Sequence, residues 1–117
     1  MYKRQRFPED ISPDVIIVSA AFTRTTGEAH WEVLLRARAI ETKAYVLASA
    51  QGGEQPSGRE TWGHSMIIDP WGDIIAKCNF GKDIVLGEVD MKKLQTVRAN
   101  LPALEHQEFN LRKRLSC

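Results

Sequence analysis

The sequence has little that would support a metal site or a disulfide framework. Cys78 and Cys117 are its only cysteines, and they are far apart, with no CxxC spacing. Such a pair indicates neither a disulfide framework nor a zinc site and is compatible with a reducing compartment. The three histidines also lack the HExxH spacing of a zinc protease. We therefore expect no metal and no other cofactor.

Long apolar runs and an excess of one charge are also missing. The longest apolar runs, 15–21 and 45–50, are far shorter than the roughly 20 residues that a membrane helix needs. No signal-peptide pattern opens the chain. Sixteen basic and fifteen acidic residues leave a formal charge of +1, which gives no electrostatic footprint for nucleic acid. There is no glycine-rich phosphate-binding motif. We expect a cytosolic protein that binds neither nucleic acid nor membranes.

What is present fits one α/β domain of 117 residues, with no repeat or linker to divide it. Residues 15–21 form a continuous, largely β-branched run that predicts a strand buried on both faces, and residues 45–50 predict a second apolar strand. The segment between them predicts a helix from Glu28 to about Lys43. Strand, helix and strand then form a βαβ unit, in which the two strands pair in parallel.

The second half of the chain predicts smaller elements. Residues 51–61 are predicted to form a long surface loop. Asp69-Pro70-Trp71-Gly72 lies between two apolar runs and has the turn residues of a hairpin. Residues 84–89 predict another strand, and Asp90 is placed to cap a helix over 91–99.

Charged residues lie on two sides of the helix predicted from Glu28. One solvated stripe comprises Glu28, Glu32, Arg36 and Lys43. Arg38 and Glu41 instead project near Trp31, Leu34 and Ala37. Burial there requires them to pair with each other, with neighbours or across a subunit contact. Two interpretations stay open, a structural or interface pair and a direct role in binding or chemistry.

The loop 22–27 follows the first predicted strand at its carboxyl end, where ligand sites of α/β sheets usually lie. Thr25, with Glu28 three residues later, can form a capping box at the helix start. The threonines of this loop therefore either cap the helix only or contribute to a ligand site. His30 either braces the loop or faces a pocket. Cys78 has no sequence sign of an activating base and is interpreted as an inert thiol.

Seven sequence blocks occur in an order and spacing typical of one enzyme family. They are Arg6–Glu9, Ala21–Thr23, Thr26-Gly27, Ala29–Glu32, Ala37–Glu41, Gly63–Met66 and Asp69–Gly72. Together they resemble the carbon-nitrogen hydrolase (nitrilase) superfamily, and within it the amidase branch that acts on deaminated glutathione and related omega-amides. The resemblance extends from about Arg6 to His106.

This resemblance implies an α-β-β-α sandwich of which residues 1–117 form only the C-terminal part. Family catalysis uses a Glu general base, a Lys that stabilises the oxyanion and a Cys thiolate that attacks the amide carbonyl. The products are a thioester and ammonia. The nucleophile stands four residues before Arg6, where this chain has Tyr2. We expect residues 1–5 to be foreign to the family and the isolated chain, which lacks all three groups, to be inactive.

The resemblance also assigns residues around the missing centre. The family's substrate-side loop corresponds to the segment that contains Phe22, Thr23, Thr25, Thr26 and His30. Arg6 and Glu9 resemble a brace after the nucleophile, and Arg38 and Glu41 match a helix motif near the subunit contact. The implied partners are a small amide substrate and a second copy, bound through helix 28–43 and the C-terminal tail 103–117. The alternative is a noncatalytic binding or assembly module, a pseudoenzyme of the same fold.

Overall fold

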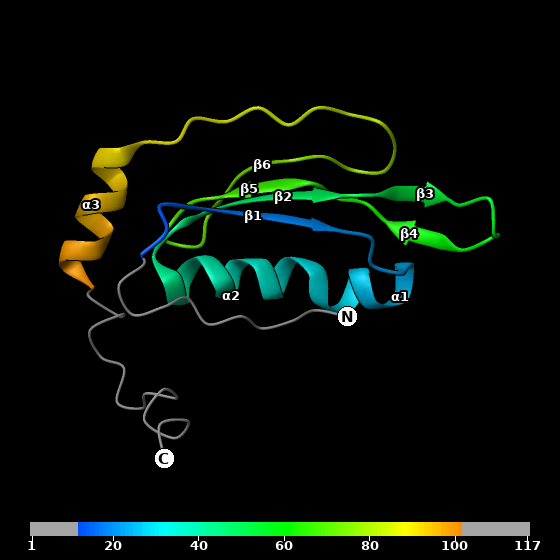
Figure 1. Ribbon diagram of the computed structural model, residues 1–117, viewed down its shortest axis with the longest axis horizontal. Helices are drawn as coiled ribbons and strands as arrows, with labels where there is room; N and C mark the ends of the chain where they lie inside the picture. The colour runs from blue at the N-terminus through cyan, green and yellow to red at the C-terminus, as the bar shows by residue number, and fades with distance from the viewer. Residues whose placement is uncertain (1–11, 102–117) are drawn as a thin grey trace, which may run out of the picture.

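The computed structural model describes residues 12–101. The elements in chain order are β1 (Val15–Ala20), α1 (Arg24–Thr26), the π-helical turn η1 (Gly27–Trp31), α2 (Glu32–Thr42), β2 (Tyr45–Ala50), β3 (Gly52–Glu54), β4 (Glu60–Trp62), β5 (Met66–Ile68), β6 (Ile74–Lys77) and α3 (Met91–Asn100). A four-stranded sheet has the order β1-β2-β5-β6, and β3 pairs with β4 separately. Figure 1 shows α2 lying along one face of the larger sheet. The α/β prediction is confirmed.

The predicted βαβ unit is present, with β1 parallel to β2 and Val15 opposite Tyr45. The prediction that the first strand is buried on both faces is wrong. β1 is the edge strand of the described sheet, and α2 covers only one of its faces. The side chain of Ile17 therefore stays 77% exposed. The β-branched run correctly predicts a strand, but it does not reveal how many neighbours the strand has.

The helical segment starts earlier than predicted, and a different threonine caps it. Thr23 has an extended backbone, and its Oγ1 accepts a hydrogen bond from the Thr26 amide at 3.4 Å. The predicted capping box of Thr25 and Glu28 is wrong, because Thr25 lies inside α1. Helical backbone then continues through η1 into α2.

The face of the helix that meets the sheet also differs from the prediction. The core comprises Trp31, Leu35, Ala39, Val46, Ala48, Met66 and Ile68. The buried helical residues are four positions apart, whereas Leu34 is half-buried and Ala37 is exposed. Lys43, expected in the solvated stripe, is only 2% exposed. It follows the last residue of α2 with a left-handed φ of 50°, so it does not continue the helical projection.

Two hairpins follow β2, and only the second was predicted. Residues 51–61 are not a long loop, because β3 and β4 pair with Gly53 opposite Thr61. Their turn is closed by the Gly58 amide, which donates to the Gln55 carbonyl at 2.8 Å. The predicted hairpin at Asp69–Gly72 is confirmed by β5 and β6. Gly72 has a φ of +95° there, a conformation that favours glycine.

The strand predicted over residues 84–89 is absent, because this segment has no regular backbone pairing. It passes over the sheet face opposite α2, where a Cβ on Gly87 would lie 3.0 Å from Ile67 Cδ1. Ile84 and Leu86 remain exposed. The helix predicted after Asp90 is confirmed as α3, and Asp90 Oδ1 accepts hydrogen bonds from the amides of Lys92 and Lys93.

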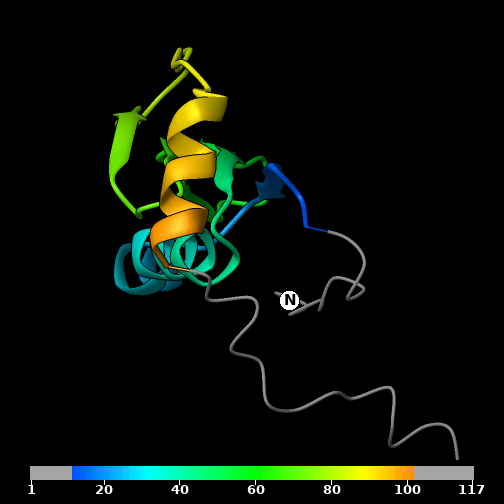
Figure 2. The same ribbon diagram turned by 90° about the vertical axis from the view of Figure 1, so that its left-hand side faces the viewer.

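Polar contacts hold α3 at the end of the sheet opposite hairpin β3–β4 (Figures 1 and 2). Arg98 donates to the Lys43 carbonyl, the Asp14 carboxylate and the Pro13 carbonyl at 3.0, 2.9 and 2.8 Å. Lys93 Nζ donates to Asp69 Oδ2 at 2.6 Å. Across residues 12–101, no helix has the length and apolar character needed to cross a membrane.

Candidate functional site

The strongest candidate site is the segment that connects β1 to the first helical turn, at the carboxyl end of the parallel pair β1 and β2. This is the edge where ligands usually bind in α/β sheets. Phe22 lies at its base, with its ring centroid 5.0 Å from that of the buried Trp31. Because Trp31 belongs to the core, Phe22 is held against a rigid support.

Thr23 and Thr26 form the polar part of this segment. Their Oγ1 atoms are 2.8 Å apart, and Thr26 Oγ1 also lies 3.3 Å from the Thr23 carbonyl. Thr23 is half-buried and Thr26 is exposed. A hydroxyl can donate and accept hydrogen bonds, so this pair can bind the carbonyl or the amino group of an amide.

The other two residues assigned to the segment lie apart from this cluster. Thr25 and His30 are both exposed, and within the described chain neither side chain makes a hydrogen bond with the threonine pair. The structure therefore brings together Phe22, Thr23 and Thr26 and leaves Thr25 and His30 at the surface.

Hairpin β3–β4 contacts the same segment, and the sequence does not predict this contact because residues 51–61 have the composition of a loop. Thr23 forms an isolated antiparallel bridge with Thr61. The Trp62 amide donates to the Phe22 carbonyl at 2.9 Å, and Arg24 Nη1 donates to Glu60 Oε1 at 2.8 Å. The signal that was present is Pro56-Ser57-Gly58, which has the turn residues of a short hairpin.

Aromatic rings extend this contact toward β5. The Trp62 and His64 rings are stacked with centroids 4.0 Å apart, and the Phe80 ring meets both edge-on. Trp31 Nε1 donates to the His64 carbonyl at 2.9 Å. His64 is thus fixed by stacking and by its backbone, which agrees with a structural role.

Cys78 is not suited to act as a nucleophile. The thiol is buried, and its amide donates to the Ser65 carbonyl at 2.9 Å. Burial, with a smaller contribution from the Asp83 carboxylate, raises the pKa of Cys78 above its ordinary value. Since the thiolate is the reactive species, a raised pKa disfavours attack on a carbonyl.

The remaining assigned residues lie elsewhere or outside the described chain. Arg38 Nη1 and Glu41 Oε1 form an ion pair at 3.3 Å, with side chains 14% and 42% exposed. This matches the first pairing considered for them and places them away from the threonine cluster. Tyr2, Arg6, Glu9 and the tail 103–117 lie outside the described residues. Within residues 12–101, no group of three or more His, Cys, Asp or Glu side chains gathers as a metal site.

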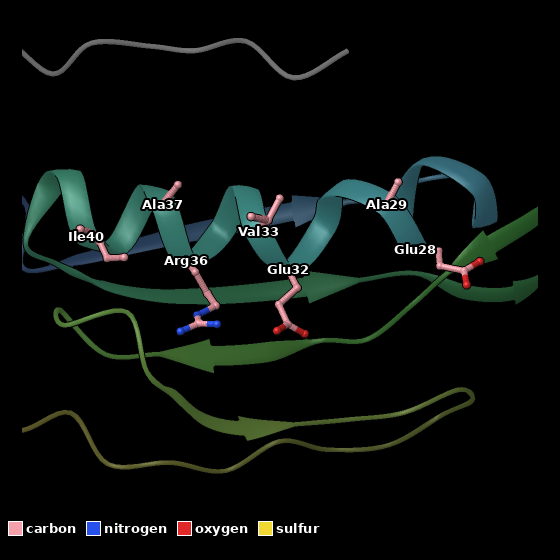
Figure 3. Close-up of a pocket in the computed structure, with 7 residues that line it drawn as sticks. All are labelled: Glu28, Ala29, Glu32, Val33, Arg36, Ala37 and Ile40. Carbon is pink, nitrogen blue, oxygen red and sulfur yellow. The ribbon is translucent and has the colours of Figure 1, made fainter.

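A shallow groove lies on the outer side of η1 and α2, with a volume of about 460 Å³. It is lined by Glu28, Ala29, Glu32, Val33, Arg36, Ala37 and Ile40. In Figure 3, Ala29, Val33 and Ala37 point away from the sheet. Val33 is 61% exposed and Ile40 is 42% exposed. Of the residues assigned to the substrate-side loop, none lines this groove, so groove and loop are separate features.

Comparison with known proteins gives a consistent family match. The model of the carbon-nitrogen hydrolase family matches residues 11–99, a range that contains the whole β1–α2 connection. The deaminated glutathione amidase of Bos taurus is 44% identical over 112 residues, covering 91% of this chain and 34% of that protein. The chain thus spans about one third of the length of the deaminated glutathione amidases it matches.

Solved structures agree with this match. The Caenorhabditis elegans NitFhit protein is 45% identical, with a TM-score of 0.74 over 79% of this chain and 23% of that one. Saccharomyces cerevisiae Nit3, described as a member of branch 10 of the nitrilase superfamily, is 30% identical, with a TM-score of 0.76 over 82% of this chain and 35% of that one. The described residues therefore share the fold of nitrilase-superfamily structures.

Proposed function

Because this chain belongs to the carbon-nitrogen hydrolase family, we propose that it supplies the C-terminal part of an amidase for small carboxylate-bearing amides. The observation that supports this most directly is the cluster of Phe22, Thr23 and Thr26, located within the matched range and at the carboxyl end of β1. An apolar ring beside two hydroxyls suits a small, mostly polar substrate. Cytosolic location remains part of this proposal.

The proposed reaction is the thioester route of the family. A Cys thiolate attacks the amide carbonyl, ammonia leaves, and water hydrolyses the acyl-enzyme. Among the described residues, Cys78 is the only cysteine, and its burial and raised pKa argue against this role. We therefore propose that the 117-residue chain binds the amide weakly but does not hydrolyse it alone, and that the Glu, Lys and Cys come from sequence of the parent protein that this chain lacks.

The test compares the chain with a chimaera. In the chimaera, this chain's residues 11–99 replace the matching part of the bovine relative, which retains its own upstream sequence. With deaminated glutathione as substrate, we expect ammonia release from the chimaera and none from the purified 117-residue chain. Thr26→Ala in the chimaera removes one hydroxyl of the cluster and should lower kcat/KM about tenfold.

Thr96→Ala is the matched control, since Thr96 lies on α3 and its hydroxyl donates to the Lys92 carbonyl at 3.0 Å. It should leave kcat/KM unchanged. Turnover by the isolated chain would show that a nucleophile has been overlooked. An inactive but folded chimaera would favour the pseudoenzyme alternative.

We also propose that the chain forms a homo-oligomer through the outer side of η1 and α2. The groove there exposes Val33 and Ile40 beside the small side chains of Ala29 and Ala37. Small residues let two helices approach closely, and the exposed aliphatic groups would lose contact with water.

Val33→Lys is expected to weaken self-association of the chain at least about tenfold, because it places a charge in an apolar contact. Sedimentation velocity across a concentration series measures this. Ile84→Lys makes the same kind of change at an 81% exposed position outside the helix and should have no effect. If Ile84→Lys instead disrupts association, the contact runs through the face opposite α2.

A further inference from the structure

Residues 60–64 run along residues 22–31 and contact them at successive positions. Glu60 pairs with Arg24, Thr61 bridges Thr23, and the Trp62 amide bonds the Phe22 carbonyl. Two residues after Trp62, the His64 carbonyl accepts a hydrogen bond from Trp31 Nε1. Strand β4 and residues 63–64 therefore contact the substrate-side loop at several positions along its length.

The loop and β4 are also closely packed against each other at Gly27 and Trp62. Gly27 lies directly against Trp62, and a Cβ on Gly27 would be 2.2 Å from Trp62 Cβ and 2.4 Å from Trp62 Cγ. Gly27 has an ordinary helical φ of −65°, so glycine is not required there by backbone conformation. It is required because the Trp62 side chain occupies the space of a side chain at position 27.

Contacts within the hairpin keep the attaching strand in place. Thr61 is only 3% exposed, and its Oγ1 donates to the Gly53 carbonyl and accepts from Gln55 Nε2, both at 3.1 Å. Glu60 of β4 lies directly opposite Glu54 of β3 in the strand register of the hairpin. Of these two carboxylates, Glu60 is the one that contacts the loop.

From this arrangement we propose that Glu60 and Trp62 are positioning residues, which fix the substrate-side loop so that the Thr23 and Thr26 hydroxyls are held in one arrangement. The inference rests on the proposed function for its consequence, since the fixed hydroxyls are the groups proposed to bind the amide. Hairpin β3–β4 thereby becomes a determinant of substrate selection, although its own residues need not touch the substrate.

Amide hydrogen exchange on the purified 117-residue chain tests the positioning directly. The reporters are the amides of Gly27, bonded to the Thr23 carbonyl at 2.7 Å, and of Trp62. Because an exposed ion pair contributes modestly, Glu60→Gln should speed exchange at both reporters about two- to fivefold. Trp62→Ala should speed exchange at Gly27 about tenfold or more.

Three comparisons separate positioning from a general loss of stability. Glu54→Gln removes the same charge from the same hairpin and should leave the reporters unchanged. The amide of Val46 in the core strand β2 should keep its rate in Glu60→Gln. The double variant Arg24→Glu, Glu60→Arg should restore slow exchange, whereas each single variant should not. If Glu60→Gln behaves like Glu54→Gln, or alters Val46 equally, the proposal is overturned.

A titration of the same variants with succinamate, a small carboxylate-bearing amide, connects positioning to binding. We expect shifts of the Thr23 and Thr26 amide resonances in the unsubstituted chain and a two- to fivefold weaker affinity in Glu60→Gln. Unchanged affinity despite faster exchange would overturn the role of the hairpin in substrate selection. No binding by the unsubstituted chain would contradict the proposed function, while the exchange rates would still decide whether Glu60 and Trp62 position the loop.

Discussion

Trp31→Ala is expected to lower the free energy of unfolding by about 3–5 kcal/mol. Trp31 is 1% exposed, packs in the core between helix and sheet, and donates from Nε1 to the His64 carbonyl. Truncation would leave a cavity and an unpaired carbonyl. Because a domain of this size is stable by only about 5–15 kcal/mol, the variant should be close to unfolding. Urea denaturation followed by far-UV circular dichroism measures the change.

Trp71→Ala is the control for this prediction, because it removes the same kind of side chain from a 56% exposed position. It loses the contact of the ring with Lys43 Nζ, which lies 5.7 Å from the ring centroid. Such a contact contributes about 0.5–2 kcal/mol, with the upper end for a desolvated cation such as Lys43, which is 2% exposed. Equal losses in the two variants would contradict the assignment of Trp31 to the core.

The second large effect is expected from Asp69→Asn, with a loss of about 2–4 kcal/mol at neutral pH. Asp69 is 1% exposed, and its Oδ1 accepts from the amides of Trp71 and Asp73 at 2.9 and 3.0 Å. Its Oδ2 accepts from Lys93 Nζ at 2.6 Å. One carboxylate thus supports the β5–β6 turn and helps to hold α3, and a neutral amide would weaken each of these bonds.

The pH dependence of this effect follows from the pKa of Asp69. Burial by itself would raise the pKa, but the hydrogen bonds from Lys93, Asp73 and Trp71 outweigh burial and lower the pKa below its ordinary value of 3.8. A lowered folded-state pKa means that the contribution is fully present above the unfolded pKa and is lost as the pH falls through the folded one. The difference between the parent chain and Asp69→Asn should therefore shrink on acidification below about pH 4.

At alkaline pH, the group whose titration affects this ion pair is Lys93. The hydrogen bond to Asp69 raises the pKa of Lys93 above 10.5, so its contribution is lost only as the pH rises through that raised value. Lys93→Met removes the donor to Asp69 Oδ2, and the Asp69 side chain is only 2% exposed. The substitution should therefore cost about 1–3 kcal/mol, although Lys93 itself is 44% exposed. Asp73→Asn, at an exposed position in the same turn, is the matched control and should stay within about 0.5 kcal/mol. Equal effects of Asp69→Asn and Asp73→Asn in urea titrations would contradict the role given to Asp69.

The candidate site could be predicted from the sequence in part. The position of residues 22–27 after a strand indicated a candidate loop, and the structure places the Thr23 and Thr26 hydroxyls 2.8 Å apart there. The sequence did not specify which threonine caps the first helical turn, because Thr23, Thr25 and Thr26 all have a hydroxyl within reach of a helix start. Nor could its attachment to Glu60 and Trp62 be foreseen, since these contacts join residues more than thirty positions apart.

The sequence by itself determined the elements that short-range physics specifies. Asp69-Pro70-Trp71-Gly72 gives a turn because its residues fit that turn locally, and Asp90 caps α3 through bonds to Lys92 and Lys93. The apolar runs give β1 and β2 for the same reason. Seven ordered blocks also pointed to the family that the residue match 11–99 supports.

Only the tertiary structure decided which faces of these elements are covered. It made β1 an edge strand of the described sheet, buried Lys43, left residues 84–89 without pairing and turned residues 51–61 into a hairpin that contacts residues 22–24. The physical reason is that burial and strand pairing depend on neighbours that are distant in sequence. A local pattern fixes what a segment can form, and the packing of the other segments fixes what it contacts.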